Sequence, residues 1–101
     1  MYAVIFTAKI KEIDTPEFNE YLATAKKMRA LATEKYGCVD FKSALEDGEE
    51  IAISYWPSLK CIEKWKSDPE HIKAQALGQQ KWYSGYNVQV VKIEREYGQH
   101  T

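Results

Sequence analysis

The chain has 101 residues, of which 45% are hydrophobic and 29% charged. Its 14 Lys and Arg residues nearly balance its 15 Asp and Glu residues, which gives a formal net charge of −1. This length and composition predict one folded domain over residues 1–101 and argue against a disordered or collagen-like chain. Domains that bind nucleic acid usually carry a basic excess, so we expect no nucleic-acid partner. No apolar run approaches the roughly 18 residues that span a bilayer, so we expect no membrane segment.

The N-terminus and the cysteines predict the compartment. The opening residues lack a positive segment, a long apolar segment and a small-residue cleavage site, so they do not resemble a signal peptide. Cys38 and Cys61 form no CxxC motif and have no cluster of metal-ligating residues around them in the sequence. Two such cysteines are typical of reduced thiols, and we expect a cytoplasmic protein.

The first half of the chain predicts a strand, a helix and a hairpin. Residues 2–11 alternate with a period of two, with apolar side chains on both faces, and predict a strand. Asp14, Thr15 and Pro16 are typical of a helix start, and apolar residues then keep a period of 3.6 to about residue 36. Strands over 38–45 and 51–56 are separated by Asp47-Gly48, a hairpin turn signal.

The second half predicts two helical segments and a last strand. Ser58 can cap a short helix over 59–66, and Asp68-Pro69 predicts a second helix that reaches about residue 83. Gly85 is expected to break that helix. Apolar residues on both faces of 87–97 predict the last strand.

This order, βαββαβ, predicts an α+β, ferredoxin-like fold with an antiparallel sheet and both helices on one face. The second face of the sheet should then be wet. However, the first and last strands carry apolar side chains on both faces, and no residues remain in this chain to cover the second one. A second copy would solve this problem, and we predict a homodimer formed through the sheet face.

The candidate site lies in the helix predicted to follow Asp68. His71, Gln75, Gly78 and Trp82 fall at i, i+4, i+7 and i+11, which places them on one stripe of a helix. One interpretation is a pocket wall, with His71 and Gln75 as polar contacts, Gly78 providing room and Trp82 an aromatic platform. The alternative is that Trp82 is a core residue and that Gly78 only lets the helix approach the sheet.

Motifs for other chemistry are missing from the sequence. It contains no GxGxxG, GxxxxGK[ST], HExxH or GxSxG motif. Its two histidines, His71 and His100, have no matching acidic cluster. We therefore expect neither a metal site nor a cofactor.

A resemblance to a known family covers nearly the whole chain and is strongest over residues 51–97. The residues that carry it are Tyr55-Trp56, Ser58-Leu59, Trp65, Glu70-His71, Ala74-Gln75, Gly78, Trp82-Tyr83, Tyr86 and Glu94-Arg95. This pattern resembles the antibiotic biosynthesis monooxygenase family. The resemblance implies a dimeric α+β barrel. It also implies an activity seen in some members, the oxidation of polycyclic phenols to quinones without metal or flavin.

The resemblance also bears on haem degradation, an activity of another branch of the family. Trp65 matches the pocket tryptophan of that branch. The branch also has an Asn on the first strand, where this chain has Thr7, and a haem-ligating His near the position of Ala74 or Gln75. The pattern therefore disfavours haem degradation, although His71, about one turn earlier, stays open as an alternative ligand.

Three hypotheses follow for the function. The first is a cofactor-independent monooxygenase acting on a small aromatic, phenol- or quinol-like molecule. In it His71 is the catalytic base or hydrogen-bond partner, and the substrate-binding residues are Trp65, Gln75, Gly78, Trp82 and Tyr86. The second is a non-catalytic small-molecule-binding or stress-related module of the same fold. The third is a structural dimer whose pocket is closed by its own side chains.

Overall fold

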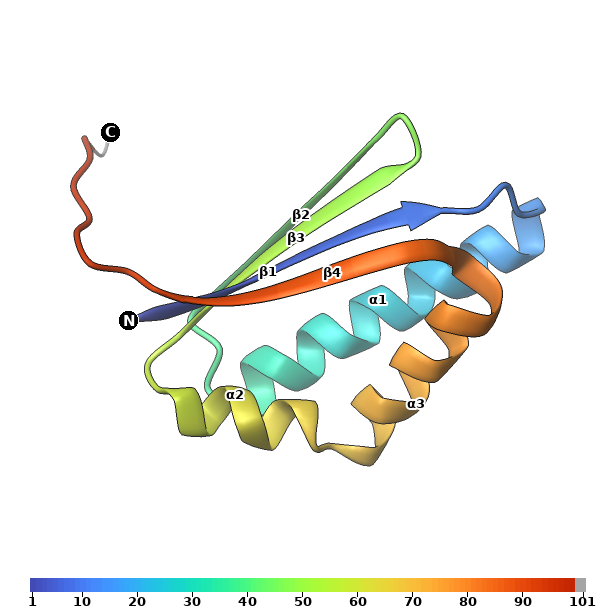
Figure 1. The fold of residues 1–101 in the computed structure, drawn as a ribbon. Helices are drawn as coiled ribbons and strands as arrows, with labels where there is room; N and C mark the ends of the chain where they lie inside the picture. Colours follow the sequence, from blue (N-terminus) through green and yellow to red (C-terminus); the bar gives the residue numbers. More distant parts are fainter. Residues whose placement is uncertain (100–101) are drawn as a thin grey trace.

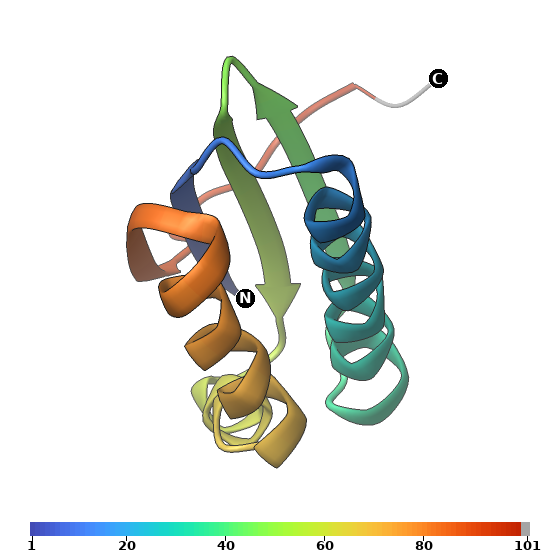
Figure 2. The ribbon, with the colours of Figure 1, turned by 90° about the vertical axis from the view of Figure 1, so that its right-hand side faces the viewer.

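The computed structural model describes residues 1–99 and has the predicted ferredoxin-like architecture (Figure 1). Its four strands form one antiparallel sheet in the order β2-β3-β1-β4. All the helices pack as one layer on the same face of that sheet, as Figure 2 shows. The elements are β1 (Tyr2–Ile10), α1 (Thr15–Lys35), β2 (Asp40–Glu46), β3 (Glu49–Trp56), α2 (Leu59–Lys66), α3 (Pro69–Leu77), η1 (Gly78–Trp82) and β4 (Tyr83–Lys92).

Side-chain caps begin all three α-helices. Asp14 Oδ1 accepts from the backbone N–H of Glu17 at 2.9 Å, at the start of α1. Ser58 Oγ accepts from Cys61 N–H at 3.2 Å and begins α2. Asp68 Oδ1 accepts from Glu70 N–H at 2.8 Å and begins α3. These caps satisfy backbone donors that a helix leaves free in its first turn, and they confirm the predicted starts.

The turn between β2 and β3 is the predicted Asp47-Gly48. Its two residues have φ angles of 51° and 77°, which places both in the left-handed region. A two-residue hairpin needs this backbone to match the twist of its strands, and Asp-Gly adopts it readily. The turn fixes the register in which Glu46 pairs with Glu49 and Asp40 with Tyr55.

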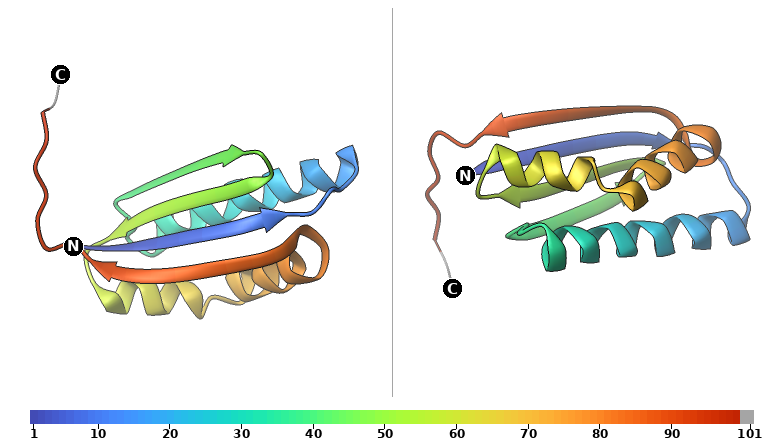
Figure 3. Two further views of the ribbon diagram at one scale, coloured as in Figure 1. Left: turned by 45° about the horizontal axis from the view of Figure 1, so that its top comes forward. Right: turned by 90° about the horizontal axis from the view of Figure 1, so that it is seen from below.

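This register separates the sheet into a helix-side face and an open face. Tyr2, Val4, Phe6 and Ala8 of β1 share the helix-side face, as the alternation predicts, and Ala3, Ile5 and Thr7 lie on the other face. The open face carries Ala3, Ile5, Ile51, Ile53, Tyr55 and Val91. No element within the described residues covers it (Figure 3).

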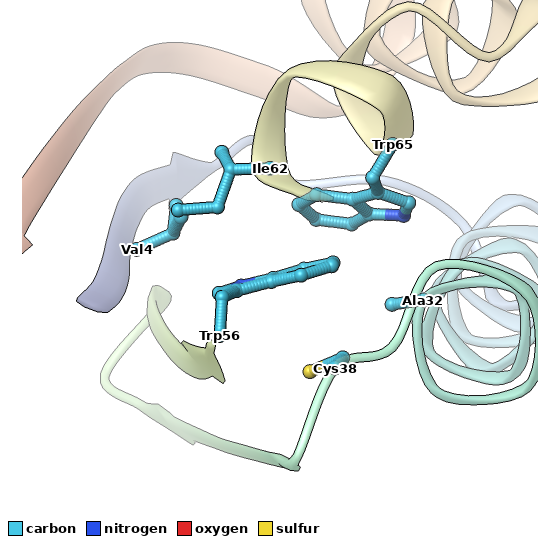
Figure 4. Packing of buried hydrophobic residues seen from close by; sticks show 6 residues of the cluster. All are labelled: Val4, Ala32, Cys38, Trp56, Ile62 and Trp65. Atoms are coloured by element: carbon cyan, nitrogen blue, oxygen red, sulfur yellow. The ribbon is translucent and has the colours of Figure 1, made fainter. Parts of the chain in front are cut away.

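The buried core gathers at one end of the helix-side face. Trp56 is fully buried, and its ring centroid lies 5.0 Å from that of Trp65 on α2. Figure 4 shows the cluster formed by these two rings with Val4, Ala32, Cys38 and Ile62. The Trp56 indole N–H donates to Ser54 Oγ at 2.8 Å, so this buried ring is satisfied within its own strand.

The end of the α3 region differs from the prediction. The helix does not continue regularly to residue 83 and break at Gly85. It closes with η1, a π-helical turn in which Tyr83 N–H bonds the carbonyl of Gly78. The last strand therefore starts at Tyr83, which pairs with Ile10, and it ends at Lys92. Residues 93–99 then leave the sheet (Figure 1), so the predicted span of 87–97 was wrong at both ends.

His100, the second of the two histidines in the sequence, lies outside the described residues. Among residues 1–99, no helix is both long and apolar enough to cross a membrane.

Gly78 lies where the π-turn brings the Tyr83 ring against the helix backbone. A Cβ atom at this position would lie 2.3 Å from Cε2 of Tyr83, far inside van der Waals contact. The Tyr83 ring is itself held by Phe6, at 5.6 Å between centroids, and by Tyr21, at 6.2 Å. A side chain at 78 must therefore displace a packed ring.

We predict that Gly78→Ala destabilises the fold by about 1–3 kcal/mol, although Ala is the better helix former by about 1 kcal/mol. Urea unfolding with fitted m-values measures the change. Gly85→Ala is the matched control, because nothing lies within 4 Å of a Cβ at that position. A Gly78→Ala protein as stable as the wild type would show that the Tyr83 ring moves freely.

Candidate functional site

A cavity of about 290 Å³ lies between the helix-side face of the sheet and the helices α1 and α3. Its floor consists of small or medium side chains of the central strands, including Val4, Ala52 and Ser54. Its sides come from α1, with Leu22, Ala25 and Met28 among them, and from α3. A cavity near 300 Å³ with a mainly apolar lining has the size and character of a small-molecule site.

Aromatic rings close the two ends of this cavity. At one end Trp65 stands over Trp56, and the imidazole of His71 packs 4.3 Å from the Trp65 ring. At the other end the Trp82 ring meets Tyr21 edge-on at 5.4 Å, and Tyr83 lies beside them. Rings at both ends with small residues between them predict room for a flat ligand.

The polar atoms of the lining provide the strongest indication of a binding site. Within residues 1–99, the buried side-chain atoms that have no hydrogen-bond partner are Glu50 Oε2, Trp65 Nε1 and Trp82 Nε1. All three residues line this one cavity. Buried polar groups are almost always paired in folded proteins, and an unpaired one costs free energy. The two indole N–H donors and one oxygen of the Glu50 carboxyl therefore lack hydrogen-bond partners in the same cavity.

His71 reaches the cavity from the first turns of α3. Its side chain is 7% exposed, and burial is the main reason that its pKa falls from 6.5 to about 4. The positive charge of nearby Lys66 lowers the pKa further, while Asp68 opposes the shift. The imidazole is therefore neutral at pH 7. In that state it carries one N–H donor and one acceptor nitrogen, which suits it to bind a ligand hydroxyl.

Glu50 is the lining residue that the sequence analysis missed. Burial raises the pKa of its carboxyl from 4.5 to about 7. The sequence pattern predicts a third strand from Ile51 and so leaves Glu50 in the turn. The available signal was the alternation Glu50, Ala52, Ser54, Trp56, which puts all four on one face once the strand starts earlier.

Two further polar side chains shape the cavity. Burial, together with the charge of Glu50, raises the pKa of Tyr83, which therefore stays a neutral phenol. Arg29 of α1 crosses to the sheet, where its Nη2 donates to Ser43 Oγ at 2.9 Å and its guanidinium lies over the Phe41 ring. Arg29 is exposed at the rim, so it contributes a cation at the mouth of the cavity.

The structure brings together four of the six residues predicted for the site. Trp65, His71, Gln75 and Trp82 all line the cavity. Gly78 and Tyr86 are not among the lining residues. Gly78 faces the Tyr83 ring instead. Tyr86 is 45% exposed, and its hydroxyl accepts from Gln79 Nε2 on the outside of the molecule. Tyr86 pairs with Ala8 on the helix-side face and its ring lies 6.2 Å from that of Phe6, so it lies beside the cavity and outside its lining.

The described residues contain no group of three or more His, Cys, Asp or Glu side chains placed to hold a metal ion. The side chains that line the cavity can form hydrogen bonds, stack on aromatic rings and transfer a proton at Glu50 or His71.

Comparisons with known proteins agree with this architecture. No family model matches the sequence. The uncharacterized protein YqjZ of Bacillus subtilis is 38% identical over 96 residues, which cover 94% of this chain and 81% of that protein. Jasmonate monooxygenase ABM of Pyricularia oryzae is 26% identical over 96 residues; the match covers 92% of this chain but only 43% of that longer protein.

Solved structures share the fold at lower sequence identity. SnoaB, a cofactor-independent oxygenase from Streptomyces nogalater, superposes with a TM-score of 0.78 at 9% identity and 97% coverage of both chains. An antibiotic biosynthesis monooxygenase superposes with a TM-score of 0.74 at 14% identity, covering 94% of this chain and 100% of the other. Likeness at this identity establishes the fold alone.

The raised pKa of Glu50 predicts how stability depends on pH. Between about pH 4.5 and 7 the folded chain holds a proton on Glu50 that the unfolded chain has lost, so the free energy of unfolding falls as pH rises. We expect Glu50→Gln to remove this loss and to exceed the wild type by about 2 kcal/mol above pH 7, allowing for solvent screening of a partly exposed group.

Urea unfolding of both proteins at a series of pH values measures this difference. Glu49→Gln is the control, because it removes the same charge from an exposed position on the open face and should leave the pH profile unchanged. A constant difference between Glu50→Gln and the wild type across this range would contradict the prediction.

Proposed function

The chain belongs to the antibiotic biosynthesis monooxygenase family, and on that premise we propose that it oxygenates a small aromatic, phenol- or quinol-like molecule without a cofactor. The family includes cofactor-independent oxygenases such as SnoaB. The reaction would take place in the cavity between the helices and the sheet. The observation that supports this proposal is the convergence of ring walls and unpartnered polar atoms in that one cavity.

The reaction balances without an external reductant. One phenol and one O₂ give one quinone and one water. A ring C–H bond and the phenolic O–H bond break, one oxygen atom forms the new carbonyl, and the other leaves as water with the two hydrogens. The substrate supplies all four electrons. The protein would contribute stacking between Trp65 and Trp82, a proton acceptor, and a cavity that keeps bulk water from the reacting ring.

In this proposal His71 is the base or the hydrogen-bond partner of the substrate. Its neutral imidazole can accept the hydroxyl hydrogen at pH 7. Its lowered pKa makes it a weak base, however, and this favours the role of a hydrogen-bond partner. The same observation supports the second candidate, a module that binds a small aromatic molecule without turning it over.

Oxygen uptake with a panel of flat phenols and quinols distinguishes the two candidates. We expect consumption of one O₂ for each quinone formed, and a loss of at least about tenfold in kcat/KM for His71→Ala, the cost of one hydrogen bond to the reacting group. Ile72→Ala, one residue along α3 and 56% exposed, is the control. Thermal stabilisation by these compounds without oxygen consumption would support the binding module, and turnover unchanged by His71→Ala would remove His71 from the mechanism.

We further propose that the working form is a homodimer joined through the open face of the sheet. Ile5, Ile53 and Tyr55 lie there next to each other on β1 and β3, and Ile51 is 46% exposed. A second copy of the same face offers the same apolar residues, and a twofold axis lets each cover the other. Residues 93–99, which leave the sheet, could then lie along the partner.

We predict that the wild type elutes as a dimer at micromolar concentration and that Ile53→Asp elutes as a folded monomer. A carboxylate in the centre of an apolar interface would be desolvated without a partner. Size-exclusion chromatography with light scattering measures the mass. Lys42→Asp, on the rim of the same face, should dimerise almost normally. A monomeric wild type would overturn this proposal.

A further inference from the structure

We propose that Glu50 receives the hydroxyl hydrogen of the ligand, and that this contact makes the cavity selective for phenols over their ethers and over quinones. The inference rests on the proposed function and deepens it. It assigns the proton acceptor to a residue on the sheet floor rather than to His71, and it narrows the substrate class to molecules with a free hydroxyl.

The position of Glu50 is the first support. It lies on β3, which is an interior strand, and pairs with Ala8 of β1 and Leu45 of β2. Strand alternation places it on the helix-side face together with Ala52 and Ser54, which form the cavity floor. Its direct neighbour on β1, Ala8, is small and 4% exposed, so the residue paired with Glu50 on that strand has only a methyl group beside the carboxyl.

The absence of a protein partner is the second support. A carboxylate oxygen that is shielded from solvent is normally paired with a cation or with hydrogen-bond donors. Here Oε2 has no partner, and none of the ion pairs within the described part of the chain includes Glu50. A hydroxyl group from a ligand would supply the missing donor. The two unpartnered indole N–H groups of Trp65 and Trp82 would meet acceptor atoms or ring faces of the same ligand.

The proton transfer has a simple form. The phenolic O–H bond breaks, the proton moves to Oε2 of the Glu50 carboxylate, and the electron pair stays on the phenolate oxygen. With its pKa near 7, the carboxyl is about half ionised at neutral pH and can both accept and return the proton. His71, with a pKa of about 4, holds a proton far less readily.

The same contact distinguishes substrate from product. A phenol presents a donor to the Glu50 carboxylate, whereas a quinone presents only acceptor oxygens. Two acceptors facing each other in a dry cavity repel, so a quinone should bind more weakly once Glu50 is ionised. Loss of the hydroxyl on oxidation would then promote release of the product.

Other charged or titratable groups face the same cavity and can contribute to the pH dependence of ligand binding there. They come from every helical element and from β4: Tyr21, Lys26 and Arg29 of α1, Lys66 of α2, His71 of α3 and Tyr83 of β4. The pKa of His71 is lowered and that of Tyr83 is raised, so both move away from neutrality and leave Glu50 to titrate there.

Calorimetric binding of 1-naphthol and 1-methoxynaphthalene tests the inference, since a methyl group in the second probe replaces the hydroxyl hydrogen of the first. Between about pH 5.5 and 8 we expect naphthol affinity to rise roughly tenfold, as its hydrogen bond becomes charge-assisted. Over the same range methoxynaphthalene should gain no affinity, and 1,4-naphthoquinone should lose affinity. Titrations in two buffers of different ionisation enthalpy should show proton release on naphthol binding below pH 7.

Glu50→Gln, which preserves shape and removes the charge, should abolish both the pH dependence and the proton release for naphthol while leaving methoxynaphthalene binding unchanged. Glu49→Gln should behave as the wild type. Binding of both probes with the same pH profile, or a naphthol profile unaffected by Glu50→Gln, would overturn the inference and leave the proposed function standing. Failure of every probe to bind would contradict the proposed function and, with it, this role for Glu50.

Discussion

The cavity depends on aromatic rings that stand at both ends of the helix-side face. Trp65 on Trp56 supports the α2 end, and Trp82 against Tyr21 supports the end near β4. Between them the floor includes the smaller side chains Val4, Ala52 and Ser54. Helices can pack down on a sheet only as far as the bulkiest residues allow, and so large rings at the ends hold them away from small residues in the middle. The room for a ligand therefore results from large side chains at the two ends of the face and small ones between them, with no need for a long loop or a lid.

The same dry environment acts in opposite directions on the two titratable groups that face it. Burial lowers the pKa of His71 to about 4 and raises that of Glu50 to about 7, because each group becomes harder to charge. Between about pH 4.5 and 6.5 the two contributions to stability oppose each other: His71 makes the fold more stable as pH rises, and Glu50 makes it less stable. Above pH 6.5 only the ionisation of Glu50 still lowers the stability of the fold as pH rises. At neutral pH the cavity thus holds an uncharged imidazole beside a carboxyl that is close to its midpoint, two groups with distinct capacities for a proton.

The sequence was sufficient for the fold because its signals are local. Asp14, Ser58 and Asp68 fall where the helices begin, and Asp47-Gly48 closes the hairpin, since caps and turns depend on a few adjacent residues. The α3 stripe grouped His71, Gln75 and Trp82, and all three line the cavity. Gly78 and Tyr86 are outside the lining: in η1 Gly78 lies against the Tyr83 ring, which packs on Phe6 and Tyr21 from distant elements, and these long-range contacts cannot be read from the local sequence. The sequence does not predict Glu50 as a lining residue for a related reason: a charged residue next to a turn is normally exposed to solvent. Only its pairing with Ala8 in the sheet places it on the helix-side face.

Three departures from ordinary folding rules meet at this one cavity. Glu50 is a carboxyl without a partner, the indoles of Trp65 and Trp82 lack acceptors, and a π-turn replaces the last regular turn before β4. Each costs stability, and each lies on the lining or sets the position of a residue that does. By contrast, Asp68 caps α3 and accepts from Tyr36 at 2.5 Å, and the buried Trp56 is satisfied by Ser54. Sequences relax local rules mainly where function requires it. The concentration of unfavourable features around one hollow, in a chain that obeys those rules elsewhere, is therefore an argument for a ligand there that is independent of the family to which the chain belongs.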